Sequence, residues 1–193
     1  MAESASPLIV VMGVSGAGKS VVGRALAASL RVDYRDGDDL HSEANVAKMA
    51  AGVALIDEDR WSWLEQVGDY LAAHVAHGAV ISCSALKRSY RDVIRSRARG
   101  AVFVHLTGAR AVAQARMLAR THFMPAALLD SQLQALEPLD PDELGVDADM
   151  AKAPDRIVAQ VLAAFPSLGR RARWVHPADP APSGPQSQPI PGV

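Results

Sequence analysis

The chain has 193 residues, of which 49% are hydrophobic and 21% are charged, and its formal net charge is -1. These values are typical of one globular domain, and the near-neutral charge excludes a general attraction to nucleic acid or to an anionic membrane. Cys83 is the only cysteine, which excludes an internal disulfide and favours a cytoplasmic protein. No segment approaches the ~20 apolar residues of a membrane span, and the N-terminus lacks the basic region of a signal peptide.

The first predicted unit is a strand, a glycine-rich loop and a helix. An apolar run predicts a buried strand over Leu8–Val14, and apolar residues at helical spacing predict a helix that ends near Leu30. A short strand from Val32 then leads into an acidic turn, and a helix is expected over Glu43–Ala50.

Further strands and helices alternate along the rest of the chain. The predicted strands are Ala79–Cys83, Val102–Thr107 and Val146–Met150. The predicted helices are Glu58–Ala76, a basic helix within Ser84–Arg99, Ala109–Arg120, Ala126–Leu136 and Pro154–Phe165. In the first of these helices, helical spacing places Trp61, Leu64, Val67 and Leu71 along one apolar side.

Strands that alternate with helices indicate an α/β fold, a three-layer domain with a parallel sheet of about five strands and helices on both faces. In such sheets ligands bind beyond the carboxyl ends of the strands, where all the motifs below fall. We expect this single domain to cover residues 1–170, with a helical lid at about 116–136. Residues 171–193 hold half of the chain's 12 prolines without apolar periodicity, so they are expected to be disordered.

The loop after the first strand carries the pattern Gly13-x-x-x-x-Gly18-Lys19-Ser20. Glycines allow the backbone to curl so that successive N–H groups point at one anion, as in a phosphate loop. A lysine at this place supplies charge to the β- and γ-phosphates, and the serine hydroxyl is placed to hold Mg²⁺. The competing interpretation is a glycine-rich turn, but the flanking strand and helix favour binding of a nucleoside triphosphate. The full set of expected ATP-binding residues is Gly13, Val14, Ser15, Gly16, Ala17, Gly18, Lys19 and Ser20.

Two carboxylates follow the second predicted strand. Asp36 and Asp38 are two residues apart, so they face the same way if the strand geometry persists. One could then lie near Mg²⁺ while the other accepts the proton of an acceptor hydroxyl. The alternative is an Asp-Gly turn in which both serve only backbone hydrogen bonds.

Two groups of basic residues are candidates for anion binding. Lys87, Arg88 and Arg91 are spaced so that at least part of the group shares a helix face, which could bind an anionic substrate or be a plain basic surface. Arg116 and Arg120, at i and i+4, could deliver guanidinium groups from a lid to the transferring phosphoryl, or could mark an exposed helix end.

Several blocks then occur in a defined order over roughly residues 8–165. They are Gly13–Ser20, Asp36–His41, Asn45–Met49, Leu55–Arg60 with Trp63-Leu64, Cys83–Lys87 with Tyr90–Asp92, Arg116 with Arg120, His122–Pro125, and Leu129–Gln132 before Leu136–Pro138. In this combination the chain resembles the gluconate kinases, a family of small-molecule P-loop kinases. The phosphate loop is shared by many kinases, whereas the blocks Asp36–His41 and Cys83–Lys87 are far more specific.

The resemblance implies an adenylate-kinase-like fold with a moving lid, Mg²⁺ and a homodimer. It also implies ATP-dependent phosphorylation of D-gluconate at the 6-hydroxyl to give 6-phospho-D-gluconate and ADP. By similarity, Asp38 would meet the acceptor hydroxyl and Asp36, with Ser20, would lie at the metal. The implied catalytic residues are Lys19, Asp38, Arg116 and Arg120, and the implied gluconate pocket contains Asp38, His41, Arg60, Lys87 and Arg91.

Two alternatives stay open. A related kinase such as shikimate kinase shares the Asp-x-Asp arrangement, but this chain lacks a Gly-Gly-Gly run after the third predicted strand. A non-enzymatic ATP-binding switch would use the same phosphate loop without an acceptor pocket. Loss of turnover with retained nucleotide affinity on Asp38→Asn would separate a kinase from such a switch.

Overall fold

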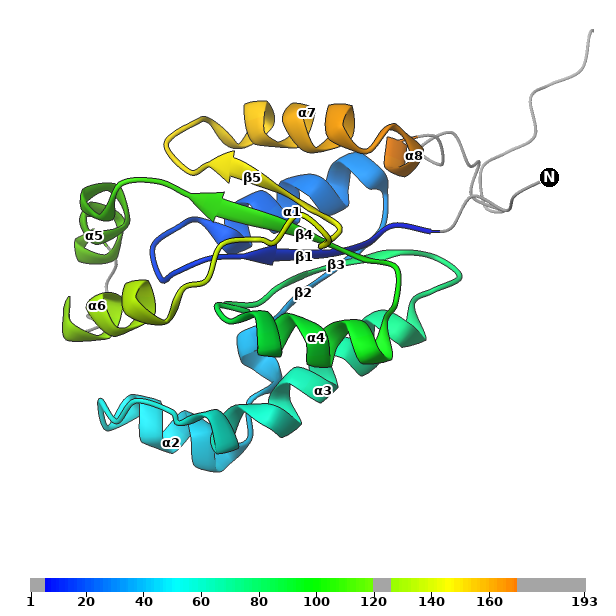
Figure 1. Cartoon of the computed structure of the whole chain (residues 1–193). Helices are drawn as coiled ribbons and strands as arrows, with labels where there is room; N and C mark the ends of the chain where they lie inside the picture. The colour runs from blue at the N-terminus through cyan, green and yellow to red at the C-terminus, as the bar shows by residue number, and fades with distance from the viewer. Residues whose placement is uncertain (1–5, 120–125, 170–193) are drawn as a thin grey trace, which may run out of the picture.

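The computed structural model describes residues 6–119 and 126–169. A five-stranded sheet in the order β2-β3-β1-β4-β5 lies at its centre, and all neighbouring strands are parallel (Figure 1). The strands are β1 (Leu8–Met12), β2 (Asp33–Asp36), β3 (Ala79–Ser82), β4 (Ala101–Thr107) and β5 (Gly145–Asp149). Every residue of β1 is buried, as expected for a continuous apolar run in the middle of a parallel sheet covered on both faces.

Helices cover both faces of the sheet (Figure 1). On one face lie α1 (Lys19–Leu30) and α7 (Pro154–Ala164), which is followed by the short α8 (Pro166–Gly169). On the other face lie α3 (Asp57–Ala73) and α4 (Arg88–Arg97). This arrangement confirms the predicted three-layer α/β fold with a parallel sheet.

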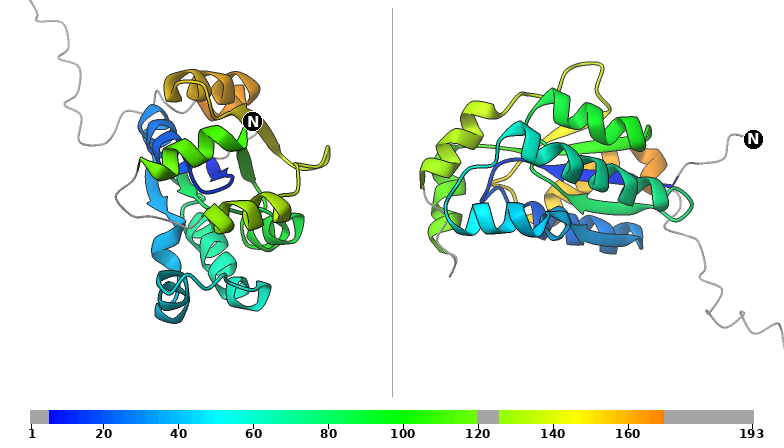
Figure 2. Two further views of the ribbon diagram at one scale, coloured as in Figure 1. Left: turned by 90° about the vertical axis from the view of Figure 1, so that its left-hand side faces the viewer. Right: turned by 90° about the horizontal axis from the view of Figure 1, so that it is seen from below.

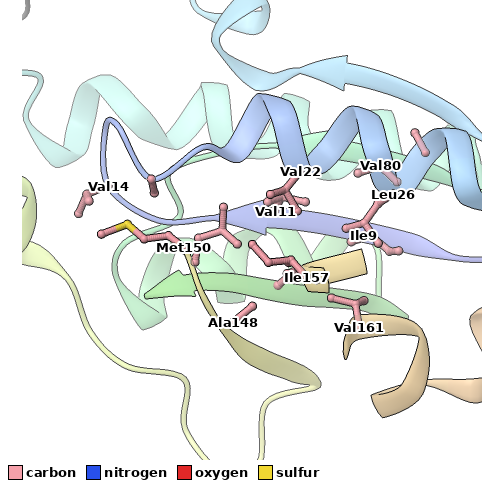
Figure 3. Close-up of a cluster of buried hydrophobic side chains, with 14 of the residues drawn as sticks. Ile9, Val11, Val14, Val22, Leu26, Val80, Ala148, Met150, Ile157 and Val161 are labelled. Carbon is pink, nitrogen blue, oxygen red and sulfur yellow. The ribbon is translucent and has the colours of Figure 1, made fainter. Parts of the chain in front are cut away.

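Two buried clusters, one on each face, hold the layers together. Alternate residues of β1 divide between them: Ile9 and Val11 pack under α1 and α7, whereas Leu8, Val10 and Met12 pack under α3 and α4. Figure 3 shows the first cluster, to which Val14 and Met150 belong together with side chains from α1 and α7. Val14 belongs to the glycine-rich loop, so this loop is anchored in the core.

The carboxyl ends of the strands meet at one end of the molecule, where α5 (Arg110–Leu118) and α6 (Ala126–Ala135) also lie (Figures 1 and 2). A 3-10 helix, η1 (Gly37–Leu40), and α2 (Glu43–Ala50) continue the chain beyond β2. The glycine-rich loop joins β1 to α1 at this same end. The topology therefore brings the predicted functional segments together.

Apart from shifts in the bounds of several elements, two details of α3 and β1 differ from the sequence-based expectations. In α3 the buried tryptophan is Trp63, which is 2% exposed, whereas Trp61 is 36% exposed. The apolar side of this helix therefore passes through Trp63, Leu64, Val67 and Leu71. The first strand also ends at Met12 rather than at Val14, because the backbone turns at Gly13.

Some expectations fall outside the described residues. Arg120 is one of these positions, and the Pro-rich segment 171–193 is another, so the predicted disorder of this segment stays a prediction. Within residues 6–119 and 126–169, none of the helices combines the length and the apolar character that a membrane span requires.

Candidate active site

The loop between β1 and α1 depends on glycine for steric reasons. Gly13, Gly16 and Gly18 all have positive φ angles, of 137°, 79° and 98°. A Cβ atom on Gly16 would lie 2.3 Å from the carbonyl oxygen of Ala113 in α5, so only glycine fits there. The loop is therefore curled and packed against α5, as a cradle of N–H groups at the start of α1 requires.

The last two residues of the loop place a cation and a hydroxyl in the first turn of α1. Lys19 Nζ donates a hydrogen bond of 3.1 Å to the carbonyl oxygen of Val14, which folds the side chain back over its own loop. Ser20 Oγ donates to Asp36 Oδ2 at 2.8 Å, so the loop is connected directly to the end of β2. A serine and a carboxylate at this separation suit Mg²⁺, which prefers oxygen ligands and takes one or two carboxylates together with phosphates.

Asp36 is the centre of a hydroxyl network. Its carboxylate also accepts hydrogen bonds from Ser82 Oγ at 2.9 Å and from Tyr34 OH at 3.3 Å. Burial would raise the pKa of Asp36, but the hydrogen bonds from Ser20, Ser82 and the Asp38 N–H outweigh it and hold the pKa below its usual value. The group is therefore ionised at neutral pH, which is the form that binds a metal.

Asp38 does not share the position of Asp36. The strand ends at Asp36, whose side chain accepts a 3.3 Å hydrogen bond from Asp38 N and so caps η1. The backbone turns at Gly37, where a Cβ atom would lie 2.3 Å from the Ser82 carbonyl oxygen. The condition that strand geometry persists is therefore not met, and Asp38 is an exposed carboxylate on a 3-10 turn.

The turn that carries Asp38 is held by Trp63. The Trp63 Nε1 donates a 2.7 Å hydrogen bond to the Gly37 carbonyl oxygen, and its ring stacks on His41 with centroids 4.1 Å apart. Burial lowers the pKa of His41, so its imidazole is mainly neutral at pH 7. Its Nδ1 is buried and has no hydrogen-bond partner among the described residues.

A charged cluster lies between α3 and the start of α4. Asp57 accepts hydrogen bonds from Lys87 Nζ at 2.7 Å and 3.0 Å, and from Tyr90 OH. Arg60 NH1 lies 3.5 Å from the same carboxylate and 3.3 Å from Tyr90 OH. The hydrogen bond to Asp57 raises the pKa of Lys87, and the bond from Lys87 lowers the pKa of Asp57, so both groups stay charged.

This cluster forms part of the wall of a pocket of about 200 Å³. The volume is below the ~300–1,000 Å³ of sites for drug-sized ligands and suits a small polar molecule. The pocket adjoins the phosphate loop on two sides: Ser84 O accepts a 3.2 Å hydrogen bond from Gly13 N, and Gln132 Oε1 accepts a 2.7 Å bond from Ser15 N. Its polar lining consists of Asp57, Arg60, Ser84, Lys87, Tyr90, Ser131 and Gln132.

The structure separates the three basic residues that the sequence placed together. Lys87 lies in the pocket, whereas Arg88 is on the surface and binds Asp142 through both terminal nitrogens at 2.8 Å. Arg91 is 0% exposed and is paired with Glu143, so the expectation that Arg91 lines the gluconate pocket is wrong. Its guanidinium also donates to four backbone carbonyl oxygens, of Ala85, Leu86, Glu137 and Pro138, and it has no group left for a ligand.

Arg116 is adjacent to the loop. Its NH1 donates to the Ala17 carbonyl oxygen at 3.0 Å, and its NH2 donates to the Met150 carbonyl oxygen at 2.7 Å. In this arrangement Arg116 links the phosphate loop to the end of β5. These two bonds use only two of its five N–H donors, so the guanidinium keeps donors for a phosphoryl group.

Cys83 follows β3 close to these groups but does not take part. The thiol is 1% exposed, and burial raises its pKa to about 12. A thiol in this state is a poor nucleophile. Cys83 instead packs as a small hydrophobic residue in the core cluster under α3 and α4.

Sequence reasoning did not assign functional contacts to Asp57, Tyr90 or Gln132. Asp57 lies in an acidic first turn of α3, where carboxylates are common for their interaction with the helix dipole alone. Gln132 approaches the loop across 117 residues of sequence, a separation over which periodicity carries no signal. Only the block Leu129–Gln132 of the family resemblance pointed to this part of α6.

Comparisons with known proteins agree with this geometry. A family model described as shikimate kinase matches residues 15–139. A gluconokinase of Gluconobacter oxydans (strain 621H) is 43% identical over 160 residues, which are 81% of this chain and 90% of that protein. The thermosensitive gluconokinase of Escherichia coli (strain K12) is 41% identical over 162 residues, which are 80% of this chain and 87% of that protein.

A solved structure is similar throughout the domain. The crystal structure of a gluconokinase from Sinorhizobium meliloti 1021 superimposes with a TM-score of 0.76 at 46% identity, covering 86% of this chain and 93% of that chain. The phosphate loop, the parallel sheet and these similarities lead to one conclusion: the chain belongs to the gluconokinase family of P-loop kinases.

Proposed function

We propose that the protein transfers the γ-phosphoryl group of ATP to the 6-hydroxyl of D-gluconate, giving 6-phospho-D-gluconate and ADP. One observation carries the proposal: a small pocket lined by cations shares a border with the phosphate loop at Ser84 and Gln132. An anionic polyol in this pocket lies next to the place where a loop of this kind holds phosphates.

The charges of the pocket match a sugar acid. Lys87 and Arg60 supply cationic donors for the carboxylate, and both already bind one carboxylate, that of Asp57. His41, at the end of the turn that carries Asp38, would bind a hydroxyl of the acceptor in its neutral form. Asp38, exposed on η1, accepts the proton of the reacting hydroxyl as general base.

The phosphoryl group is stabilised from the nucleotide side. N–H groups within the loop Gly13–Ser20 and the Lys19 ammonium bind the phosphates of ATP. Ser20 and Asp36 would hold Mg²⁺, which would neutralise charge on the phosphates when bound. Arg116 and Arg120 belong to the lid of about residues 116–136 and approach the phosphoryl group during transfer. A cytoplasmic homodimer completes the proposal.

A substrate panel tests the proposal. Purified protein with ATP and Mg²⁺ should release ADP in the presence of D-gluconate and not with shikimate or neutral polyols, and other sugar acids in the panel measure the breadth of the pocket. A protein that ignores gluconate and consumes shikimate would belong with the related kinases whose family model matches residues 15–139.

The switch alternative requires a different test. Asp38→Asn should lower turnover about 10²- to 10⁴-fold, because it removes the general base, while the Kd for ATP stays unchanged. Turnover is measured by a coupled ADP assay and Kd by calorimetry. Unchanged turnover would show that Asp38 is not the base, and a wild-type protein with ATP binding but no acceptor would favour the switch.

A further inference from the structure

Gln132 of α6 contacts both halves of the site. Its side-chain oxygen accepts a 2.7 Å hydrogen bond from the Ser15 N–H, which is one of the phosphate-loop amides. The same side chain lines the pocket that contains Lys87 and Arg60. The assignment of the two amide atoms follows from chemistry, since a backbone N–H requires an acceptor and only the oxygen can be one.

The position of Gln132 is set by its helix and not by the loop. Leu129, one turn earlier, is 0% exposed and belongs to the core cluster under α1 and α7. Asp130 pairs with Arg110 of α5 at 2.7 Å, and beyond the helix Glu137 N donates to the Leu86 carbonyl oxygen at 2.8 Å. Three separate contacts therefore hold this segment where Gln132 reaches Ser15.

We infer that Gln132 couples the two substrates: its amide oxygen holds the Ser15 N–H while no nucleotide is bound, and ATP releases it into the acceptor pocket. This inference rests on the proposed function. An amide oxygen on a phosphate-loop N–H competes with a phosphate oxygen for the same donor. Binding of ATP must break this hydrogen bond, so the contact weakens ATP binding by the net strength of one hydrogen bond.

The released side chain has a use in the pocket. Among the described residues, Gln132 Nε2 has no hydrogen-bond partner, and the freed oxygen adds an acceptor. An amide with both a donor and an acceptor suits the hydroxyl groups of a polyol, for which the cations Lys87 and Arg60 offer no acceptor. ATP binding therefore increases the affinity for the sugar acid, and by linkage the sugar acid increases the affinity for ATP by the same factor.

Two substitutions at position 132 should act in opposite directions on the nucleotide. Gln132→Ala removes the competing acceptor, so the Kd for a non-hydrolysable ATP analogue, measured by calorimetry without gluconate, should fall about 3- to 10-fold. Gln132→Glu keeps an acceptor and adds a negative charge that strengthens the hold on Ser15 and repels phosphate, so this Kd should rise. The control is Gln134→Ala, an exposed residue of the same helix, which should change neither value.

The coupling is measured by repeating the titrations with saturating D-gluconate. The wild type and Gln134→Ala should bind the analogue more tightly with gluconate present, whereas in Gln132→Ala the ratio of the two Kd values should approach 1 and the KM for gluconate should rise about 3- to 10-fold. Thermal melting of each variant separates these effects from loss of fold. An unchanged or weaker affinity of Gln132→Ala for the analogue without gluconate overturns the inference. This titration needs no acceptor, so it gives its answer even if the wild type fails to phosphorylate gluconate and the proposed function is wrong.

Discussion

The nucleotide side and the acceptor side of this site are built in different ways. On the nucleotide side the proposed binding groups are N–H groups of one short loop, whose shape is set by Gly13, Gly16 and Gly18 and by Val14 in the core. On the acceptor side the polar groups are side chains from α3, α4 and α6, and the strongest of them already bind each other through Asp57.

This difference has an energetic consequence. A backbone cradle is preorganised, because its donors are fixed before the ligand arrives. In the proposed function the acceptor side must exchange ion pairs, since a sugar carboxylate would compete with Asp57 for Lys87 and Arg60. Affinity for the acceptor therefore depends on the difference between the contacts of Lys87 and Arg60 with the sugar carboxylate and their contacts with Asp57. Mutations of these residues should change the KM for the acceptor more than the free energy of unfolding.

The largest expected effect is a loss of stability at Arg91, a residue near the acceptor side that holds the fold and does not bind the substrate. Arg91→Met breaks the fully buried pair with Glu143, so the free energy of unfolding should fall by about 3–5 kcal/mol, measured in urea. The fraction that still folds should keep its KM for gluconate, because Arg91 is 0% exposed and outside the pocket. A KM that rises as much as in a Lys87 variant would mean that Arg91 does reach the substrate.

Acid should weaken the same ion pair between Arg91 and Glu143 and so lower the free energy of unfolding. Burial raises the pKa of Glu143, but the hydrogen bonds from Arg91, Asp140 N and Arg95 outweigh it and lower the pKa to about 2 from a usual value of 4.5. A carboxylate with a lowered pKa stabilises the fold fully above pH 4.5, and this contribution, about 3 kcal/mol, is lost as the pH falls toward 2. Urea unfolding at a series of pH values should show this slope, and Glu143→Gln should flatten it. Equal slopes in both proteins would assign acid lability to other carboxylates.

Binding of the acceptor should depend on Lys87 and not on its basic neighbour. Lys87→Met should raise the KM for gluconate about 10- to 100-fold, as expected for one charge-assisted hydrogen bond, with little change in the Kd for ATP. Arg88→Met is the matched control, because Arg88 is bound to Asp142 on the surface. Steady-state kinetics give the KM for gluconate of the two variants. Equal increases in KM would show that the overall positive charge of this region, and not the position of Lys87, determines binding.

The smallest expected effect concerns the shape of the phosphate loop. Gly16 and Gly52 both have positive φ angles, of 79° and 73°, but only at Gly16 would a Cβ meet another atom, the Ala113 carbonyl oxygen. Gly16→Ala should therefore lower the free energy of unfolding by about 1–3 kcal/mol more than Gly52→Ala, which carries the backbone strain alone. Denaturant melts measure the free energy of unfolding of both variants. Equal decreases would indicate that α5 moves to admit the Cβ atom without a loss of stability.

The same contrast explains what the sequence could predict. A loop that works through its backbone carries its signal in consecutive residues, so Gly13–Ser20 and the strand and helix around it were predicted together. The family blocks added Arg60 and Lys87, which the structure brings to one pocket. The parallel sheet followed from the alternation of apolar strands with helices, and the helix Glu43–Ala50 has the predicted bounds.

The missed features depend on contacts between distant segments. At least part of the group Lys87, Arg88 and Arg91 was expected to share a helix face. Arg88 and Arg91 lie on α4, but Lys87 is the extended residue before this helix, with φ -100° and ψ 151°. The burial of Arg91 depends on Glu143, 52 residues away, within an acidic segment that looks solvent-exposed in the sequence. The strand geometry on which the pairing of Asp36 with Asp38 depended ends at Asp36, and the next residue, Gly37, packs closely against the Ser82 carbonyl oxygen of β3.

The reactivity of Cys83 can report how often the structure around the site opens. It is the only thiol in the chain, and it lies at the end of β3 between the two halves of the site with 1% of its surface exposed. An alkylating reagent can reach it only when the surrounding structure opens, so the labelling rate of the native protein measures how often this opening occurs. Because no other cysteine competes, ligands that close the junction between β3 and the phosphate loop can be ranked by how much they slow the labelling, without any engineered reporter.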